Sequence, residues 1–154
     1  MNKQDFKIEE MYPLISEIIS SGGSFRLFPK GISMLPTIKQ GVDSVELAAP
    51  KKLKKYDVVL YKRPNGQFVI HRIMKIKGEE ATLCGDNQVS LEKGVDLNDI
   101  LAKVIGIYKG EKLFKNTDFF YKVYSFVWAN TRVFRRVWRG ARRKIKKHLI
   151  FKGK

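Results

Sequence analysis

The sequence predicts a mostly β domain of antiparallel strands flanked by two helices. Short runs rich in β-branched and aromatic residues, separated by glycine-containing turns, fill the chain from Ser24 to Tyr108. Apolar residues recur at helical spacing before this region and again after it. We therefore expect an N-terminal amphipathic helix within residues 1–23, a β domain over residues 24–110 and a basic amphipathic helical tail over residues 117–154.

The N-terminal helix is expected from Phe6 to Ser20, where Ser21-Gly22-Gly23 ends the pattern. Charged residues occupy the other faces of this helix, so we expect its apolar face to pack against the β domain. The apolar face consists of Ile8, Met11, Tyr12, Ile15, Ile18 and Ile19.

Six strands are expected in the β domain. The hairpin signal Asn65-Gly66 lies between the third and the fourth of them, and it predicts that these two strands pair. The basic segment from Ala49 to Lys55 is expected to be a solvated connection. The expected strands are Ser24–Phe28, Ser44–Leu47, Tyr56–Lys62, Gln67–Ile76, Glu80–Leu83 and Ile100–Tyr108.

Most of the net charge of +16 lies in the tail. From Asp118 onward the sequence has twelve Lys or Arg residues and one acid, so eleven of the sixteen net charges belong to this part. The basicity of the chain therefore says little about the β domain. A hydrophobic content of 44% is enough for a packed core, which excludes a globally disordered chain.

Aromatic and aliphatic residues of the tail follow a helical stripe, and Lys and Arg residues occupy the other directions. This pattern is typical of a helix lying on an anionic membrane surface, which predicts membrane contact through residues 118–154. The alternatives are a helix docked on the β domain and a nucleic-acid-binding arm; interleaved aromatics favour a lipid or protein face over base stacking. The stripe consists of Phe120, Val123, Tyr124, Val127, Thr131, Phe134, Trp138, Ala141, Ile145 and Leu149.

Cys84 is the single cysteine, which excludes an intramolecular disulfide and a multi-cysteine zinc site and fits a reducing compartment. The charged segment Met1–Glu10 is unlike a secretory signal peptide. No run of about 18 apolar residues predicts a transmembrane helix. No histidines or carboxylates have metal-ligand spacing, so we expect no metal and no cofactor. These features predict a cytoplasmic protein, peripheral to the membrane where the tail contacts it.

Ser33 is the candidate nucleophile. It lies in the segment Gly31–Ile38, where Pro36 restricts the backbone and Gly31 permits a turn, so the serine can be held at a fixed angle. His71, about forty residues later, is the candidate base; strand alternation places it on one face with Val69 and Ile73. The other histidine, His148, lies in the basic tail and is interpreted as a surface residue.

Four segments occur in the order of the sequence boxes of a known family: Ser33-Met34-Leu35-Pro36-Thr37, Tyr56-Asp57-Val58-Val59-Leu60-Tyr61, Val69-Ile70-His71-Arg72-Ile73 and Gly85-Asp86-Asn87. Together they resemble type I signal peptidases and the self-cleaving domains of SOS-type repressors. The resemblance covers roughly residues 28–106. It implies a signal-peptidase-like antiparallel β fold and a serine endopeptidase with a Ser–Lys or Ser–His dyad.

The resemblance also implies the roles of individual residues. Ser33 matches the nucleophile, and His71 stands where the bacterial enzymes have a lysine base, so the chain is similar to the endoplasmic-reticulum-type and archaeal branch. Asp86 matches the aspartate of the Gly-Asp-Asn box and can orient the imidazole or stabilise its charged form. Glu92 is the alternative acid for this role, because that branch often has a further acid just after the box.

The segment around Ser33 is expected to bind substrate and the oxyanion. These roles fall to Gly31, Met34 and Pro36, together with the backbone N–H of Ser33. The family often has a serine two residues before the nucleophile, where this chain has Gly31, which lacks a hydroxyl. The transmembrane helix that usually precedes the nucleophile is also missing, which favours a dedicated peptide precursor over general protein export.

We therefore expect a serine endopeptidase that cleaves a leader or signal-like segment of a peptide or protein precursor. The alternative is a catalytically inactive module on the same fold that binds a peptide, a membrane or nucleic acid. Two further candidates are weaker: Ser90 and Lys93 form an isolated Ser-x-x-Lys pattern, and Cys84 could act as a thiol nucleophile but is interpreted as a small buried residue.

Overall fold

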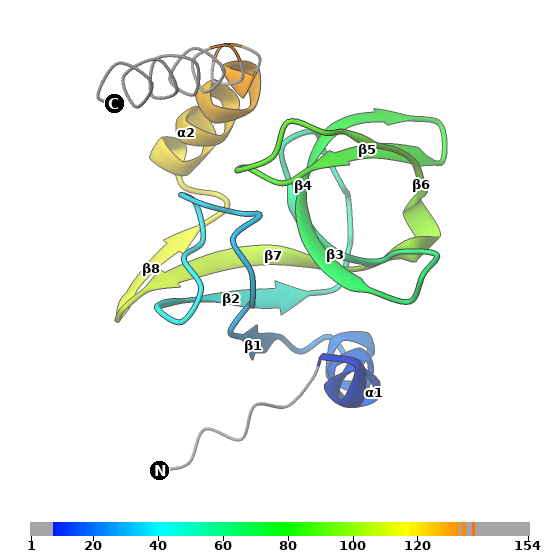
Figure 1. Ribbon diagram of the computed structural model, residues 1–154. Helices are drawn as coiled ribbons and strands as arrows, with labels where there is room; N and C mark the ends of the chain where they lie inside the picture. The colour runs from blue at the N-terminus through cyan, green and yellow to red at the C-terminus, as the bar shows by residue number, and fades with distance from the viewer. Residues whose placement is uncertain (1–7, 133, 135–136, 138–154) are drawn as a thin grey trace, which may run out of the picture.

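The computed structural model describes residues 8–132, 134 and 137. These residues form an eight-stranded antiparallel sheet with a helix at each end, which confirms the predicted mostly β fold (Figure 1). The elements in chain order are α1 (Ile8–Ser20), β1 (Phe25–Leu27), β2 (Asp43–Ala48), β3 (Val58–Lys62), β4 (Phe68–Lys77), β5 (Glu80–Cys84), β6 (Glu92–Asp96), the 3-10 turn η1 (Leu97–Asp99), β7 (Ile100–Lys109), β8 (Lys112–Lys115) and α2 (Phe119–Asn130).

The strands are arranged in the order β1-β2-β7-β3-β4-β5-β6. β7 is the long strand that joins the two halves of the sheet: β2 pairs with one edge, and β3 and β8 pair with successive parts of the other. Figure 1 shows β3, β4, β5 and β6 curling round into a ring, while β2 and β8 lie beside the long strand and β1 lies beside β2.

The hairpin of β3 and β4 forms as the Asn65-Gly66 signal predicts, through a longer turn. Gly66 adopts φ +85° and donates its N–H to the Arg63 carbonyl at 2.8 Å, and Arg63 donates to the Gln67 carbonyl at 2.9 Å. A glycine suits this turn because a positive φ costs it little. The resulting register pairs Val59 with His71, so the turn helps to fix the position of the candidate base.

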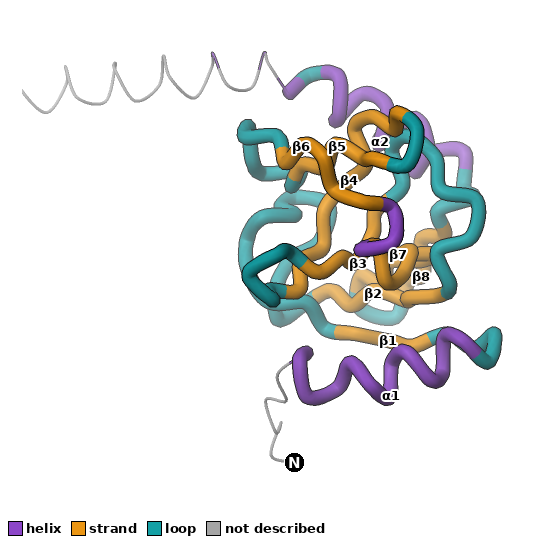
Figure 2. The backbone as a smooth tube through the Cα atoms, turned by 90° about the vertical axis from the view of Figure 1, so that its right-hand side faces the viewer, coloured by secondary structure: helices purple, strands orange, loops and turns teal. Residues whose placement is uncertain are grey.

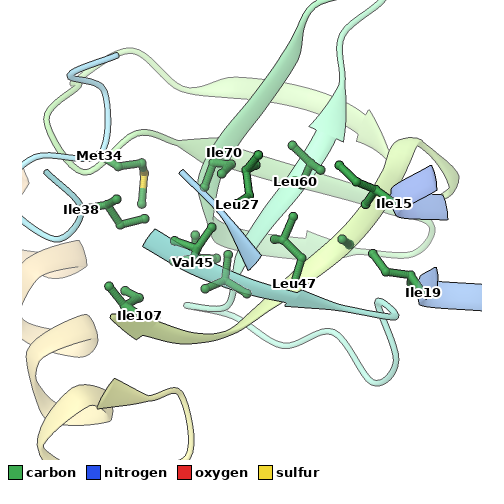
Figure 3. Close-up of a cluster of buried hydrophobic side chains, with 13 residues drawn as sticks. Ile15, Ile19, Leu27, Met34, Ile38, Val45, Leu47, Leu60, Ile70 and Ile107 are labelled. Carbon is green, nitrogen blue, oxygen red and sulfur yellow. The ribbon is translucent and has the colours of Figure 1, made fainter. Parts of the chain in front are cut away.

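Two hydrophobic clusters form the core, and strands β3 and β4 contribute to both. Alternating side chains of a strand point to opposite faces, so Leu60 and Ile70 join one cluster while Val59 and Ile73 join the other. The first cluster, seen in Figure 3, contains α1 side chains together with side chains of the sheet. Its buried members are Ile15, Ile19, Leu27, Met34, Ile38, Val45, Leu47, Val58, Leu60, Ile70, Ala102, Val104 and Ile107.

The two helices lie at opposite ends of the molecule, as Figures 1 and 2 both show. α1 packs beside β1 and buries Ile15 and Ile19, in agreement with the expected apolar face. Within residues 8–132, 134 and 137, none of the helices combines the length and the apolar character needed to cross a membrane.

Candidate active site

Ser33 lies in the loop between β1 and β2, where it is partly exposed. The loop is anchored by Met34 and Ile38, whose side chains are buried in the first core cluster. Gly31 adopts φ +95° and donates its N–H to Gln40 Oε1 at 2.8 Å. The bond of Gly31 before Ser33 and the buried side chains of Met34 and Ile38 after it therefore hold the loop on both sides of Ser33.

Asn87 holds this loop from the other side of the site. Its backbone N–H donates to the Ser33 carbonyl at 2.7 Å, and its Nδ2 donates to the Ile32 carbonyl at 3.1 Å. The loop that carries Ser33 is thus bonded to the segment that follows β5, although more than fifty residues separate them in the sequence.

His71 lies on β4 with its side chain fully buried. Its Nδ1 atom is 3.1 Å from Glu92 Oε1 and 3.2 Å from the hydroxyl oxygen of Tyr61. Tyr61 donates its one hydroxyl proton to Glu92 Oε2, so both neighbours present acceptor oxygens to Nδ1. The proton of the neutral imidazole therefore belongs on Nδ1, and Nε2 carries the free lone pair.

The Nε2 atom of His71 is buried, and it has no hydrogen-bond partner among the described residues. The Ser33 hydroxyl accordingly does not bond to it in this structure. Gly85 lies between the two: a Cβ built at Gly85 would be 3.0 Å from His71 Nε2 and 2.7 Å from the Ser33 carbonyl oxygen. The missing side chain of Gly85 allows the histidine and the serine loop to approach each other.

Glu92 is fixed by Arg63 as well as by Tyr61. Arg63 Nε donates to Glu92 Oε2 at 2.9 Å, and Arg63 Nη2 donates to Oε1. Burial alone would raise the pKa of Glu92, but the bonds from Arg63 and Tyr61 and the nearby His71 lower it. The carboxylate beside His71 is therefore ionised at neutral pH.

Burial lowers the pKa of His71 to about 4, and the opposing attraction of Glu92 is smaller. The imidazole is therefore neutral at neutral pH, with Nε2 able to accept a proton. Burial also raises the pKa of Tyr61, which the adjacent Glu92 carboxylate raises further. Tyr61 consequently stays protonated and remains a donor to Glu92.

A cavity of about 680 Å³ contains both candidate residues. One wall is the segment from Phe28 to Ser33, and the other is the start of β4 from Phe68 to His71. β5 pairs with β4 from Arg72 onward, so within the described chain this first part of β4 has a strand partner on one edge alone. The wall of the cavity is therefore an open strand edge.

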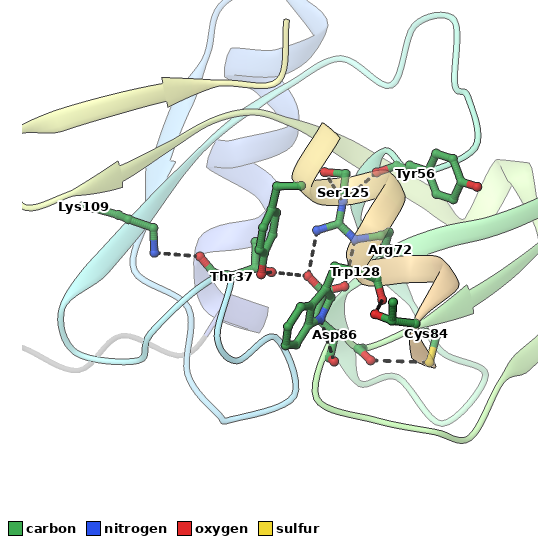
Figure 4. Close-up of polar contacts among 11 residues, drawn as sticks. Thr37, Tyr56, Arg72, Cys84, Asp86, Lys109, Ser125 and Trp128 are labelled. Atoms are coloured by element: carbon green, nitrogen blue, oxygen red, sulfur yellow. Dashed lines mark hydrogen bonds and ion pairs between the residues drawn. The ribbon is translucent and has the colours of Figure 1, made fainter. Parts of the chain in front are cut away.

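The prediction that Asp86 could orient His71 is corrected by its contacts. Both of its carboxylate oxygens bond to Arg72, at 2.8 Å from Nε and 2.7 Å from Nη2, and one also accepts from Thr37 (Figure 4). Arg72 follows His71 in sequence but points to the opposite face of β4, where Asp86 meets it. Of the two candidate acids, the structure places Glu92 against the imidazole.

The buried pair of Arg72 and Asp86 is also the docking site of α2. Arg72 Nη1 donates to Ser125 Oγ at 2.9 Å, and Trp128 Nε1 donates to the Asp86 carbonyl at 3.1 Å (Figure 4). Thr37 gives its proton to Asp86, so it accepts from the Tyr124 hydroxyl at 2.8 Å. The first part of the tail, α2, thus docks on the β domain, which agrees for these residues with the alternative of a docked helix.

The remaining predicted residues fall in different places. Gly31 and Met34 line the cavity of Ser33, but the Gly31 N–H is already bonded to Gln40 and is not available as an oxyanion donor. Pro36 lines a second groove and is not among the residues that line the cavity of Ser33, so its contact with substrate stays a prediction. Cys84 is buried at the end of β5. Residues 138–154, with His148 and Trp138, lie outside the described residues.

Tyr61 and Arg63 were not among the predicted site residues. The hairpin register could have indicated Tyr61, because it pairs Tyr61 with Val69 and Val59 with His71, which puts all four on one face. No comparable signal marks Arg63, which lies in the turn. No group of three or more His, Cys, Asp or Glu side chains within the described part of the chain could hold a metal ion.

A scan against protein-family models, a search of curated proteins and a search of solved structures each return no match.

Proposed function

We propose that this protein is a serine endopeptidase in which Ser33 is the nucleophile, His71 the general base and Glu92 the acid that holds His71. The observation that carries the proposal is the state of His71. The fully buried imidazole has its Nδ1 atom 3.1 Å from the fixed Glu92 carboxylate and 3.2 Å from the Tyr61 hydroxyl, and its Nε2 atom lies beside the Ser33 loop without a hydrogen-bond partner among the described residues. A buried polar atom without a partner is costly, and such atoms are typical of sites that have a functional reason for them.

In the proposed mechanism, the Ser33 hydroxyl turns to His71 Nε2 when substrate fills the cavity, as catalytic hydrogen bonds often tighten on binding. Nε2 takes the proton while Ser33 Oγ attacks the scissile carbonyl, and the negative charge of Glu92 stabilises the imidazolium. His71 then protonates the leaving amine, which leaves an acyl-enzyme. Water, deprotonated by His71, hydrolyses the ester and restores the serine.

The open edge of β4 supports an extended peptide as substrate. A peptide strand can add to the Phe68–His71 edge by backbone hydrogen bonds, and this places its carbonyls beside His71 and Ser33. Exposed Phe28 and Ile32 on the facing wall favour apolar side chains near the cleaved bond. This geometry suits the leader or signal-like segment of a precursor, and we place the activity in the cytoplasm, at the membrane surface.

The experiment is labelling with a fluorophosphonate probe, which reacts with activated serines. Wild type is compared with Ser33→Ala, His71→Ala and the control Ser90→Ala, which removes an exposed serine outside the cavity lining. We expect labelling of wild type and Ser90→Ala, and none of the other two. Equal labelling of wild type and Ser33→Ala would remove Ser33 as nucleophile and leave the inactive binding module as the better interpretation.

A further inference from the structure

We propose that the outer face of α2 is a docking surface for an anionic lipid bilayer. The outer face consists of Phe119, Phe120, Val123, Phe126 and Val127, all of which are exposed, with Phe119 at 73% and Phe120 at 85%. Large apolar side chains with this exposure, gathered on one helix, mark an interaction surface.

The outer face is a continuous, exposed stripe along α2, and at one edge of it Phe126 contacts the Tyr56 ring of the domain edge-on, with the ring centroids 5.9 Å apart. At about 100° per residue, its five side chains fall within an arc of about 120°. Ser125 and Trp128, which bond to the domain, fall on the opposite side of the helix, and Tyr124, which bonds to Thr37, lies at the border of the stripe beside Phe120. α2 thus uses hydrogen bonds to hold the domain and leaves its apolar stripe toward the surroundings. Phe134 and Val137, 73% and 67% exposed, extend the exposed apolar set beyond α2.

A groove of about 300 Å³ continues the apolar surface toward the Ser33 loop. It runs beside Phe120 and is lined by Tyr121, Phe114 and Ile107, with Pro36 at the end that belongs to the loop. Pro36 follows Ser33 closely in the chain, so a bilayer that contacts the outer face also lies beside the loop of the candidate nucleophile.

Charge identifies the occupant as an anionic bilayer. Beyond Asn130 the sequence contains eleven Lys or Arg residues and no Asp or Glu. A second copy of the chain would bring two such segments together and be repelled, and nucleic acid would engage the cations without burying the stripe of Phe and Val. A bilayer with anionic headgroups can bind both the apolar stripe and the Lys and Arg residues, because the apolar residues enter the acyl boundary while the cations contact the headgroups.

The test uses co-sedimentation of the full chain with vesicles of phosphatidylcholine alone or with phosphatidylglycerol added. We expect binding to the anionic vesicles, weakened by added salt, and binding at least about tenfold weaker to phosphatidylcholine alone. The triple variant Phe119→Gln, Val123→Gln, Val127→Gln should bind anionic vesicles at least about tenfold more weakly than wild type, because lost apolar burial lowers affinity. Ser33→Ala should bind as wild type does, so the result is independent of the proposed peptidase activity.

The matched controls are single variants. Val123→Gln should weaken binding, whereas Leu14→Gln, which removes a comparably exposed apolar side chain from α1 at the other end of the molecule, should not. Thermal unfolding by circular dichroism checks that each variant folds. If the triple variant does not fold, the vesicle binding of Val123→Gln alone tests the role of the outer face. Absence of vesicle binding, or equal binding by wild type and the stripe variants, would overturn the proposal. So would a wild-type dimer in solution that the stripe variants convert to monomer.

Discussion

His71 and Arg72 are neighbours in sequence, and each contacts an acid on its own face of β4. The two residues differ in how many of their polar atoms have hydrogen-bond partners. Arg72 and Asp86 form a closed arrangement in which the guanidinium also bonds to the Tyr56 carbonyl and Ser125. On the other face, His71 meets Glu92 through Nδ1 alone and keeps Nε2 without a hydrogen-bond partner in the described part of the chain.

This difference predicts that the Arg72–Asp86 pair serves the stability of the fold, whereas the His71–Glu92 pair serves the proposed reactivity of the site. Removing one member of a satisfied buried ion pair leaves a charge without compensation, so the Arg72 face should affect stability. The His71 face holds a base in one tautomer beside a cavity, so changes there should affect reactivity first. The following predictions test this separation, beginning with the largest expected effect.

Glu92→Gln should lower the rate of fluorophosphonate labelling on the order of 10³-fold while the protein stays folded. The amide presents an N–H toward His71 Nδ1, which favours the tautomer with the proton on Nε2 and removes the base. The rate is measured as labelled protein over time, with the exposed turn variant Glu111→Gln as control. An unchanged rate in Glu92→Gln would contradict the role of Glu92.

Asp86→Ala should lower the free energy of unfolding by about 3–5 kcal/mol, because it leaves the buried Arg72 charge unpaired. Urea denaturation followed by circular dichroism measures the change. The double variant Arg72→Met, Asp86→Leu should be more stable than Asp86→Ala, because it removes both charges. Equal losses in the single and double variants would show that the ion pair is not the cause.

Stability should fall by about 3 kcal/mol as pH drops from about 6.5 to about 4, because of His71. Its pKa is about 4 in the folded protein against 6.5 as the ordinary value, so in this window the unfolded chain binds a proton that the folded protein does not. Arg72 stays charged throughout and contributes no such slope.

The pH dependence is measured by urea denaturation of wild type and His71→Gln across this window. The variant should lack the loss that His71 causes, although Glu92 adds a further loss in both proteins near the acid end. Parallel curves for the two proteins would contradict the burial of a neutral imidazole.

Trp128→Phe should cost about 1 kcal/mol of stability and leave the labelling rate unchanged. The phenyl ring keeps apolar contact, but the hydrogen bond from Trp128 to the Asp86 carbonyl is lost. Thermal unfolding and probe labelling on the same sample measure both quantities. A fall in the labelling rate without a fall in stability would contradict the prediction that the Arg72 face affects stability and the His71 face affects reactivity.

Local sequence patterns predicted many of the strands, whereas the remaining strands form because a neighbouring strand pairs with them. The β3–β4 hairpin carries its own turn signal, but β6 has the sequence Glu-Lys-Gly-Val-Asp and becomes a strand because β5 pairs with it. β8 likewise depends on β7. Such strands lack the apolar alternation on which a sequence argument depends, since β structure is fixed by neighbours as much as by propensity.

The candidate site shows the same limit. Sequence boxes indicated Ser33 and His71, but they could not decide between Asp86 and Glu92, because the face of the strand that each acid meets is a property of the folded sheet. The tail was predicted from its apolar stripe, which placed Tyr124 with Val123 and Val127. In the structure Tyr124 bonds to Thr37 on the domain, since α2 docks through hydrogen bonds that apolar periodicity does not reveal.

The docking of α2 sets where the chain can be divided. A shortened protein that ended with β7 would contain every candidate catalytic side chain, and it would also open the Arg72–Asp86 pair to water and take Tyr124 away from Thr37. Thr37 lies in the same loop as Ser33, so the loss would reach the backbone around the proposed nucleophile. The smallest unit that preserves the candidate site therefore extends through α2, and the helix is as much a part of the fold around this site as the strands are.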